Sequence, residues 1–172
     1  MEKSLPAKNN LFNLLSAVCA VMCAAVCIAS CAKSGDALKD GYYTAEFNDY
    51  DANGWKGYLT IRISGQKIIH AEYDAVNPSG FLKSWDIDYM RFMNNLFGTY
   101  PNAYSRKYAE ELIREQDFKD IDCVSGATYS YHAFLMLAEA VLENARLGIT
   151  EPRLVPVDPE LFIKYSLLGD LY

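Results

Sequence analysis

Alternation of apolar and polar positions marks two neighbouring strands in the middle of the chain. Residues 58–64 place Leu59, Ile61 and Ile63 on one face, because successive side chains of a strand point to opposite sides. Residues 67–76 alternate in the same way. There the pattern directs four side chains to the core: Ile69, Ala71, Tyr73 and Ala75. It directs three to solvent: His70, Glu72 and Asp74. Gly65-Gln66 between the strands suits a two-residue hairpin turn.

The rest of the domain is predicted to contain one more main strand and three helices. Residues 41–47 (GYYTAEF) favour a strand, and a loop rich in Asn, Asp and Gly follows at 48–57. Helical spacing predicts three helices, over residues 86–97, 102–116 and 128–147. Gly148 suits the end of the last helix, and we expect a short strand before Asp122 and a short helix from Pro159. These elements predict an α+β single domain, a small antiparallel sheet with helices packed on it.

The first thirty residues have the pattern of an export signal. A polar start with Lys3 and Lys8 precedes an almost wholly apolar run over residues 11–30. The run ends in Ile28-Ala29-Ser30-Cys31, which resembles the lipobox of bacterial lipoproteins, where the cysteine is acylated and becomes the first residue after cleavage. An uncleaved membrane helix is the alternative, because a run of this length can span a bilayer. Either way the domain is expected to be tethered outside the cytoplasm.

Charge and cysteine content narrow the classes of function. Two of the 16 basic residues and one of the 22 acidic ones precede Cys31, so the remainder carries a net charge of −7. A protein that follows a nucleic-acid backbone needs a basic face, so no nucleic-acid partner is expected. Four cysteines repeat at every fourth residue: Cys19, Cys23, Cys27 and Cys31. This spacing is consistent with a row of thiolates that binds a metal or with small apolar residues in the core of a signal peptide. We favour the signal peptide. Cys123 is then left without an internal disulfide partner.

Residues 122–130 (DCVSGATYS) open the long helix and carry the clearest chemical signal. The first N–H groups of a helix have no partner within it, and the helix dipole favours an anion there. Gly126 and Ala127 keep bulky side chains away from that end, and Thr128 adds a hydroxyl. The alternative is an ordinary N-terminal cap, with Ser125 accepting backbone N–H bonds. Because Ser and Thr commonly cap helices, the residues by themselves favour the cap.

The same segment resembles the flavinylation motif of FMN-binding-domain proteins, Asp-x-x-Ser/Thr-Gly-Ala-Thr. The motif positions here are Asp122, Ser125, Gly126, Ala127 and Thr128. The flanking sequence over residues 41–147 is also similar to the small FMN-binding lipoproteins of that family. The resemblance divides the chain into four parts: a lipoprotein signal peptide (1–30), a tether (31–40), an FMN-binding domain (41–148) and a C-terminal extension (149–172).

The resemblance implies a membrane-anchored, extracytoplasmic electron carrier. In this family a separate FAD:protein FMN transferase attaches the FMN half of FAD to the motif threonine. Thr128 would therefore carry FMN through a phosphoester, and Asp122 would help the transferase to recognise or activate the site. Electrons would come from a membrane quinone or a dehydrogenase, and Cys31 would hold the protein on the lipid membrane, on its periplasmic side or at the cell surface. The flavin, and no side-chain acid or base, would perform the redox step, so a carrier is expected rather than an enzyme.

An aromatic slot is expected around the flavin ring. The residues that stack on it or line it would be Trp55, Trp85, Tyr89 and Tyr129. Four polar residues in predicted loops either contact the polar edge of the flavin or form turns: Asp74, Asn77, Lys83 and Ser84. Cys123 is either a redox thiol or a small buried residue, and we favour the small buried residue. His132 follows Thr128 by four positions and is expected on the helix face of the flavin.

Three other functions compete with this interpretation. A ligand- or partner-binding surface lipoprotein without covalent flavin would stay colourless beside an active transferase. A flavin-dependent reductase would turn over a defined small acceptor with saturation kinetics. A non-covalent FMN binder would lose its flavin on denaturation.

Overall fold

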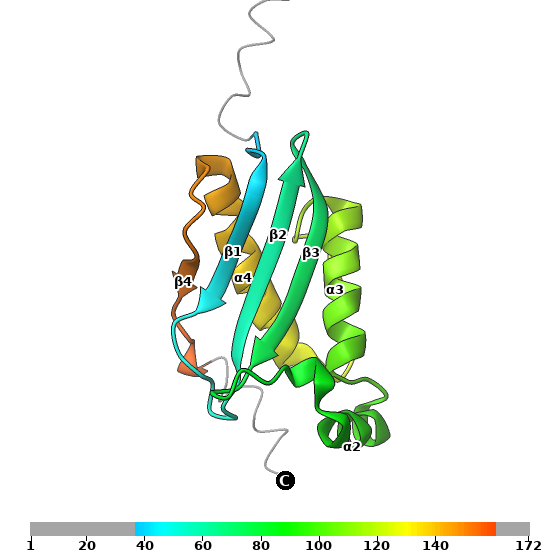
Figure 1. Cartoon of the computed structure of the whole chain (residues 1–172). Coiled ribbons are helices and arrows are strands. Elements are labelled where there is room, and N and C mark those ends of the chain that lie inside the picture. The colour runs from blue at the N-terminus through cyan, green and yellow to red at the C-terminus, as the bar shows by residue number, and fades with distance from the viewer. Residues whose placement is uncertain (1–36, 161–172) are drawn as a thin grey trace, which may run out of the picture. The chain divides into compact units, whose positions relative to one another are not determined.

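The computed structural model describes residues 37–160, which form one four-stranded sheet and a set of helices (Figure 1). The strands are β1 (Gly41–Phe47), β2 (Lys56–Ser64), β3 (Lys67–Val76) and β4 (Arg153–Val155). The helices are the short 3₁₀ helix η1 (Lys83–Trp85), α2 (Ile87–Phe97), α3 (Pro101–Glu115) and α4 (Thr128–Leu147). The predicted α+β class is confirmed. The export signal and Cys31 lie outside the described residues, as does nearly all of the helix expected from Pro159.

The sheet has the order β3-β2-β1-β4, and its first three strands are antiparallel. Strand β4 was not predicted, and it pairs parallel to β1, with Glu46 opposite Leu154. The turn between β2 and β3 is the predicted one, with φ of 58° at Gly65 and 63° at Gln66. Positive φ at both central residues is the geometry that matches the twist of a two-residue hairpin.

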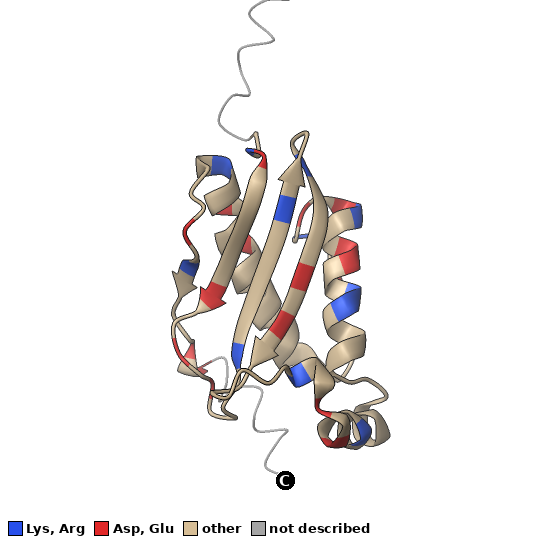
Figure 2. Ribbon diagram, in the orientation of Figure 1, with Lys and Arg blue, Asp and Glu red and all other residues tan. Residues whose placement is uncertain are grey.

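One face of the sheet carries the core and the other is open to solvent. Figure 1 shows α4 lying behind β1 and β2, and α3 lying beside β3. Leu59, Ile61 and Phe134 are fully buried between these layers, and burial of such a side chain stabilises the fold by about 1.5–3 kcal/mol. Both acidic and basic residues occur along the strands (Figure 2), and on the open face the Arg62 guanidinium lies over the Tyr42 ring at 5.4 Å. Within residues 37–160, no helix has both the length and the apolar character that a membrane span requires.

The pattern of β3 differs from the prediction at two positions. The register shifts between Arg62 and Ile63, so that His70 pairs with Arg62 but Ile68 pairs with Ile63. The extra residue of this bulge is Ile69, which is 46% exposed, whereas Ile68 is buried. Asp74 was predicted to face solvent after the strand, yet it lies within β3 and is buried.

The segment before α4 was predicted to contain a short strand, and this was wrong. Residues 121–124 are irregular, because their backbone groups bond to tyrosine side chains of the helices instead of to a strand. Helix boundaries shift by one residue elsewhere. Asp86 is the N-cap of α2 and accepts from the Tyr89 N–H, and Pro101 is the first residue of α3. Gly148 ends α4 with a left-handed φ of 74°, as predicted.

Candidate functional site

Two tyrosines fix the loop that carries the motif. The Tyr108 hydroxyl, from α3, accepts a hydrogen bond from the Val124 N–H at 3.1 Å. The Tyr131 hydroxyl, from α4, donates to the Ile121 carbonyl at 2.8 Å. Their rings also pack on each other, with centroids 5.8 Å apart. The loop is therefore held from both helices immediately before Thr128.

Helix α4 begins at Thr128 without a side-chain cap. Its N-cap residue is Ala127, and no side chain accepts a hydrogen bond at this end. Ser125 is exposed and does not cap, so the capping alternative is wrong. The backbone N–H groups and the positive end of the helix dipole are left to favour an anion next to the Thr128 hydroxyl.

Gly126 is required by the backbone and by its neighbour. Its φ is +80°, a backbone conformation that residues other than glycine rarely adopt. A Cβ at this position would lie 2.5 Å from the Cβ of Phe97, the last residue of α2. The motif loop and the end of α2 thus meet closely at a position where no side chain fits.

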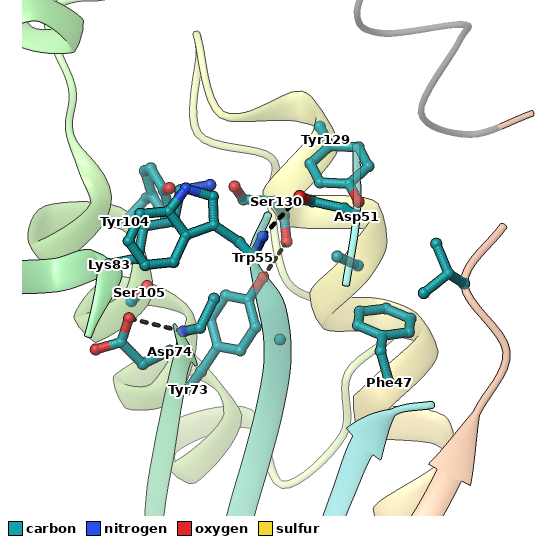
Figure 3. Close-up of a pocket in the computed structure, with 14 residues that line it drawn as sticks. Phe47, Asp51, Trp55, Tyr73, Asp74, Lys83, Tyr104, Ser105, Tyr129 and Ser130 are labelled. Carbon is teal, nitrogen blue, oxygen red and sulfur yellow. Dashed lines mark hydrogen bonds between the residues drawn. The ribbon is translucent and has the colours of Figure 1, made fainter. Parts of the chain in front are cut away.

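A pocket opens beside the first two turns of α4 (Figure 3). Its empty volume is about 430 Å³, including the part that is open to solvent. Its lining comes from α4, α3, η1, the β1–β2 loop, the adjoining ends of β1, β2 and β3, and the segment after β4. The lining residues that the argument uses are Asp51, Trp55, Tyr73, Lys83, Tyr104 and Tyr129. The two residues that follow Thr128, Tyr129 and Ser130, are both part of the wall.

Asp51 joins the β1–β2 loop to the start of α4. Its Oδ1 accepts from the N–H groups of Asn53 and Trp55, each at 2.9 Å, which holds the indole at the pocket. Figure 3 shows Tyr129 of α4 beside this carboxylate. Burial raises the pKa of the Tyr129 phenol, and the charge and hydrogen bond of Asp51 raise it further. Tyr129 is therefore a neutral donor throughout the physiological pH range.

Two further tyrosines supply uncharged pocket walls. The Tyr73 hydroxyl donates to the Ser130 carbonyl at 2.7 Å, and burial raises the pKa of that phenol well above its usual value. Burial also raises the pKa of Tyr104, although a hydrogen bond with the Ser130 side chain partly opposes the shift. The charged side chains of the pocket are consequently Asp51, Asp74 and Lys83.

Lys83 is buried beneath two aromatic rings. The residue is 8% exposed, and its ammonium lies 5.8 Å from the Trp55 ring centroid and 5.4 Å from that of Tyr89. The neighbouring residue, Ser84, donates from its hydroxyl to the buried carboxylate of Asp74 at 2.5 Å. This arrangement presents a cation to an aromatic pocket.

The chain has a clear relative among lipoproteins. It is 36% identical over 120 residues to the 15 kDa lipoprotein of Treponema pallidum (strain Nichols), covering 70% of this chain and 85% of that protein. This chain belongs to the family of that lipoprotein. No family model matches the chain.

A solved crystal structure shares the fold of this lipoprotein family member. The crystal structure of the CPE2226 protein from Clostridium perfringens is 40% identical and has a TM-score of 0.68. That match covers 70% of this chain and 99% of the other. A solution NMR structure of a Clostridium thermocellum protein is 29% identical, with a TM-score of 0.45, and covers 63% of this chain and 92% of the other.

The residues predicted to surround a flavin divide into two groups in this member of the family. Trp55 and Tyr129 line the pocket, together with the polar residues Asp74 and Lys83. Tyr89 contacts the Lys83 ammonium from outside the lining. The rest lie elsewhere.

Besides Tyr89, four of the predicted flavin neighbours are absent from the pocket lining: Trp85, Asn77, Ser84 and His132. Trp85 is 61% exposed and packs edge-on against Phe81. Asn77 forms a turn, accepting from the N–H groups of Ser79 and Phe81. His132 packs edge-on against Tyr131 outside the pocket lining. Cys123 is exposed, so its interpretation as a small buried residue is wrong.

Several pocket residues carried no local signal of a site in the sequence. Tyr73 and Tyr104 matched ordinary core positions, and only the folded chain brings β3, α3 and α4 to one point. Asp51 carried a weak signal, because an Asp two residues before an Asn and three before a Gly is typical of a turn. Among the described residues, no cluster of three or more His, Cys, Asp or Glu side chains is arranged to hold a metal ion.

Proposed function

We propose that this protein is a membrane-anchored, extracytoplasmic flavoprotein that carries electrons through FMN attached covalently to Thr128. The observation that carries the proposal is the start of α4. Thr128 is its first residue, the helix end has no side-chain cap, and the next two residues line an aromatic pocket. The same residue is the final threonine of the Asp-x-x-Ser-Gly-Ala-Thr motif.

The attachment requires a separate FAD:protein FMN transferase. The Thr128 oxygen attacks the phosphorus on the FMN side of FAD, the bond to AMP breaks, and AMP leaves with the electron pair. The hydroxyl proton passes to a base of the transferase. A threonine hydroxyl is a poor nucleophile without such activation. Asp122 is exposed in the same loop, where a transferase can recognise it.

The residues at the site fit the parts of FMN. The phosphodiester anion suits the N-terminal end of α4, where the helix dipole and backbone N–H groups favour negative charge. Trp55 and Tyr129 offer aromatic faces for the ring system, a kind of contact worth about 0.5–1.5 kcal/mol beyond the buried area. Once bound, FMN supplies the electron transfer.

Membership in the lipoprotein family supports the membrane anchor. The lipobox-like residues 28–31 precede the described domain by only a few positions, so acylation of Cys31 would place the domain at the outer side of a membrane. A covalent link suits an exported cofactor, which would otherwise be diluted into the medium. A membrane quinone or a dehydrogenase would be the electron donor.

Intact mass spectrometry tests the covalent link. The chain is coexpressed with an active FMN transferase, beside the variants Thr128→Ala and Thr60→Ala. Thr60 is a control hydroxyl on the open face of the sheet, where it pairs with Thr44 at 2.9 Å. We expect a gain of FMN minus one water in the wild type and in Thr60→Ala, and no gain in Thr128→Ala. A folded wild-type protein without the gain would overturn the proposal and favour a ligand-binding lipoprotein.

A further inference from the structure

Lys83 lies in an environment that is unusual for a lysine without a functional role. Its side chain is buried, and its ammonium lies against the rings of Trp55 and Tyr89. Among residues 37–160, no carboxylate forms an ion pair with it and no acceptor takes a hydrogen bond from it. Lysine is among the residues that are almost never buried without a partner.

The carboxylates that line the same pocket are already engaged. Asp51 accepts from two backbone N–H groups, and Asp74 accepts from the hydroxyl and the N–H of Ser84. Cation–π contacts offset part of the cost of burying the Lys83 charge. They leave its three N–H donors without a protein acceptor, although the Nζ atom is not itself fully buried and borders the open pocket. The ammonium is therefore placed to donate to an acceptor on a molecule bound in the pocket.

We propose that Lys83 binds the electron-rich, carbonyl-bearing edge of the flavin ring and stabilises the reduced flavin. This inference rests on the proposed function. A flavin that takes up two electrons and one proton gains one negative charge, which a nearby ammonium stabilises more than it stabilises the neutral oxidised ring. Lys83 would thereby raise the midpoint potential of the bound FMN.

The placement of Lys83 favours the ring over the phosphate. The phosphate would sit at Thr128, which is not part of the pocket lining, whereas Lys83 enters the pocket from η1 among aromatic side chains. Its flanking indole and phenol, from Trp55 and Tyr89, are surfaces suited to a planar ring. The hydrogen bond between Ser84 and Asp74 fixes η1 and thus the root of the Lys83 side chain.

Redox titration of the FMN-loaded protein tests the inference. Loading is first verified by intact mass, and the midpoint potential is then measured for the wild type, Lys83→Met, Lys83→Gln and Lys83→Arg. Lys119→Met is the matched control, because Lys119 is also over an aromatic ring, at 6.0 Å from Phe118, but is exposed and absent from the pocket lining. Each Met variant removes the same charge.

We expect Lys83→Met and Lys83→Gln to lower the potential, with a tenfold loss of preference for reduced flavin corresponding to about 30 mV for two electrons. Lys83→Arg should retain most of the wild-type value, and Lys119→Met should match it. Equal potentials in flavin-loaded wild type and Lys83→Gln would overturn the inference while leaving the proposed function intact. Reduced loading with an unchanged potential would also overturn it, because that result assigns Lys83 to the phosphate. Absence of the mass gain in the wild type overturns both.

Discussion

The hydroxyl of Ser84 donates a 2.5 Å hydrogen bond to the carboxylate of Asp74, and both residues are buried. The Ser84 N–H donates to the other oxygen of the same carboxylate at 3.2 Å. The pair joins η1 to the end of β3, across ten residues of chain. Since Lys83 and Trp85 flank Ser84, this contact helps to direct the Lys83 side chain into the pocket, while the Trp85 side chain stays exposed outside it.

Replacement of Ser84 by alanine should destabilise the fold. Asp74 would lose its hydroxyl donor while staying buried, and an incompletely satisfied buried polar group costs about 1–3 kcal/mol. Chemical denaturation gives the free energy of unfolding. Ser64→Ala, at an exposed position, should change it by less than about 0.5 kcal/mol. Equal stability of the two variants would contradict the role assigned to the pair.

Gly126→Ala should be more harmful than Gly80→Ala, although φ is nearly the same at both positions, +80° and +78°. Alanine at either position pays about 1–2 kcal/mol for the left-handed backbone. Only at Gly126 does the added Cβ meet another atom, the Cβ of Phe97, whereas nothing lies within 4 Å at Gly80. Overpacking adds about 1–3 kcal/mol. The difference in the free energy of unfolding between Gly126→Ala and Gly80→Ala measures the cost of the contact with Phe97. The fraction of Gly126→Ala that carries FMN should also be lower than that of the wild type.

The sequence predicted the elements well and the pocket poorly, for physical reasons. Strands and helices follow local periodicity, so the hairpin at Gly65 and the end of α4 at Gly148 were predictable. The bulge at Ile69 depends on the pairing of two strands, and β4 is too short to show a period. The motif at Thr128 was visible because its residues are contiguous. Lys83 was expected either to contact the flavin edge or to form a turn. Tyr104 comes from a separate element, and nothing in its local sequence indicates that it lines the same pocket.

Gln116→Ala should loosen the edge of the sheet. The Gln116 amide accepts from the Ile68 N–H at 2.8 Å and donates to the Ile68 carbonyl at 2.9 Å, joining the end of α3 to β3. Without it, we expect a loss of about 1–3 kcal/mol in the free energy of unfolding. Gln66→Ala is the control, because Gln66 is exposed and its φ of 63° is similar to the φ of 60° at Gln116. The two variants share the backbone strain, so equal losses would show that the amide contacts do not stabilise the fold.

Tyr108→Phe should release the motif loop while keeping the aromatic packing of the core. The Val124 N–H loses its acceptor, whereas the stacking of ring 108 on Phe134, with centroids 5.3 Å apart, is preserved. Hydrogen exchange of the Val124 amide should become faster. Tyr42→Phe, at an exposed position on the open face of the sheet, should leave that exchange unchanged. Unchanged exchange in Tyr108→Phe would show that the loop is held by other contacts.

The free energy of unfolding should decrease at alkaline pH, in part because the Tyr58 phenol loses its proton more readily in the unfolded state. Burial raises the pKa of this phenol to about 12, and the charges of Asp74 and Glu72 add to the shift. An unfolded tyrosine loses its proton near pH 10. Below pH 10 both states hold the proton and the stability is fully present. Between pH 10 and about 12 the unfolded state releases the proton first, so the free energy of unfolding decreases as pH rises. Denaturation of wild type and Tyr58→Phe near pH 8 and near pH 11 checks this, since the variant should lose less stability between the two. An equal loss in both proteins would assign the alkaline transition to the more deeply buried tyrosines of the pocket.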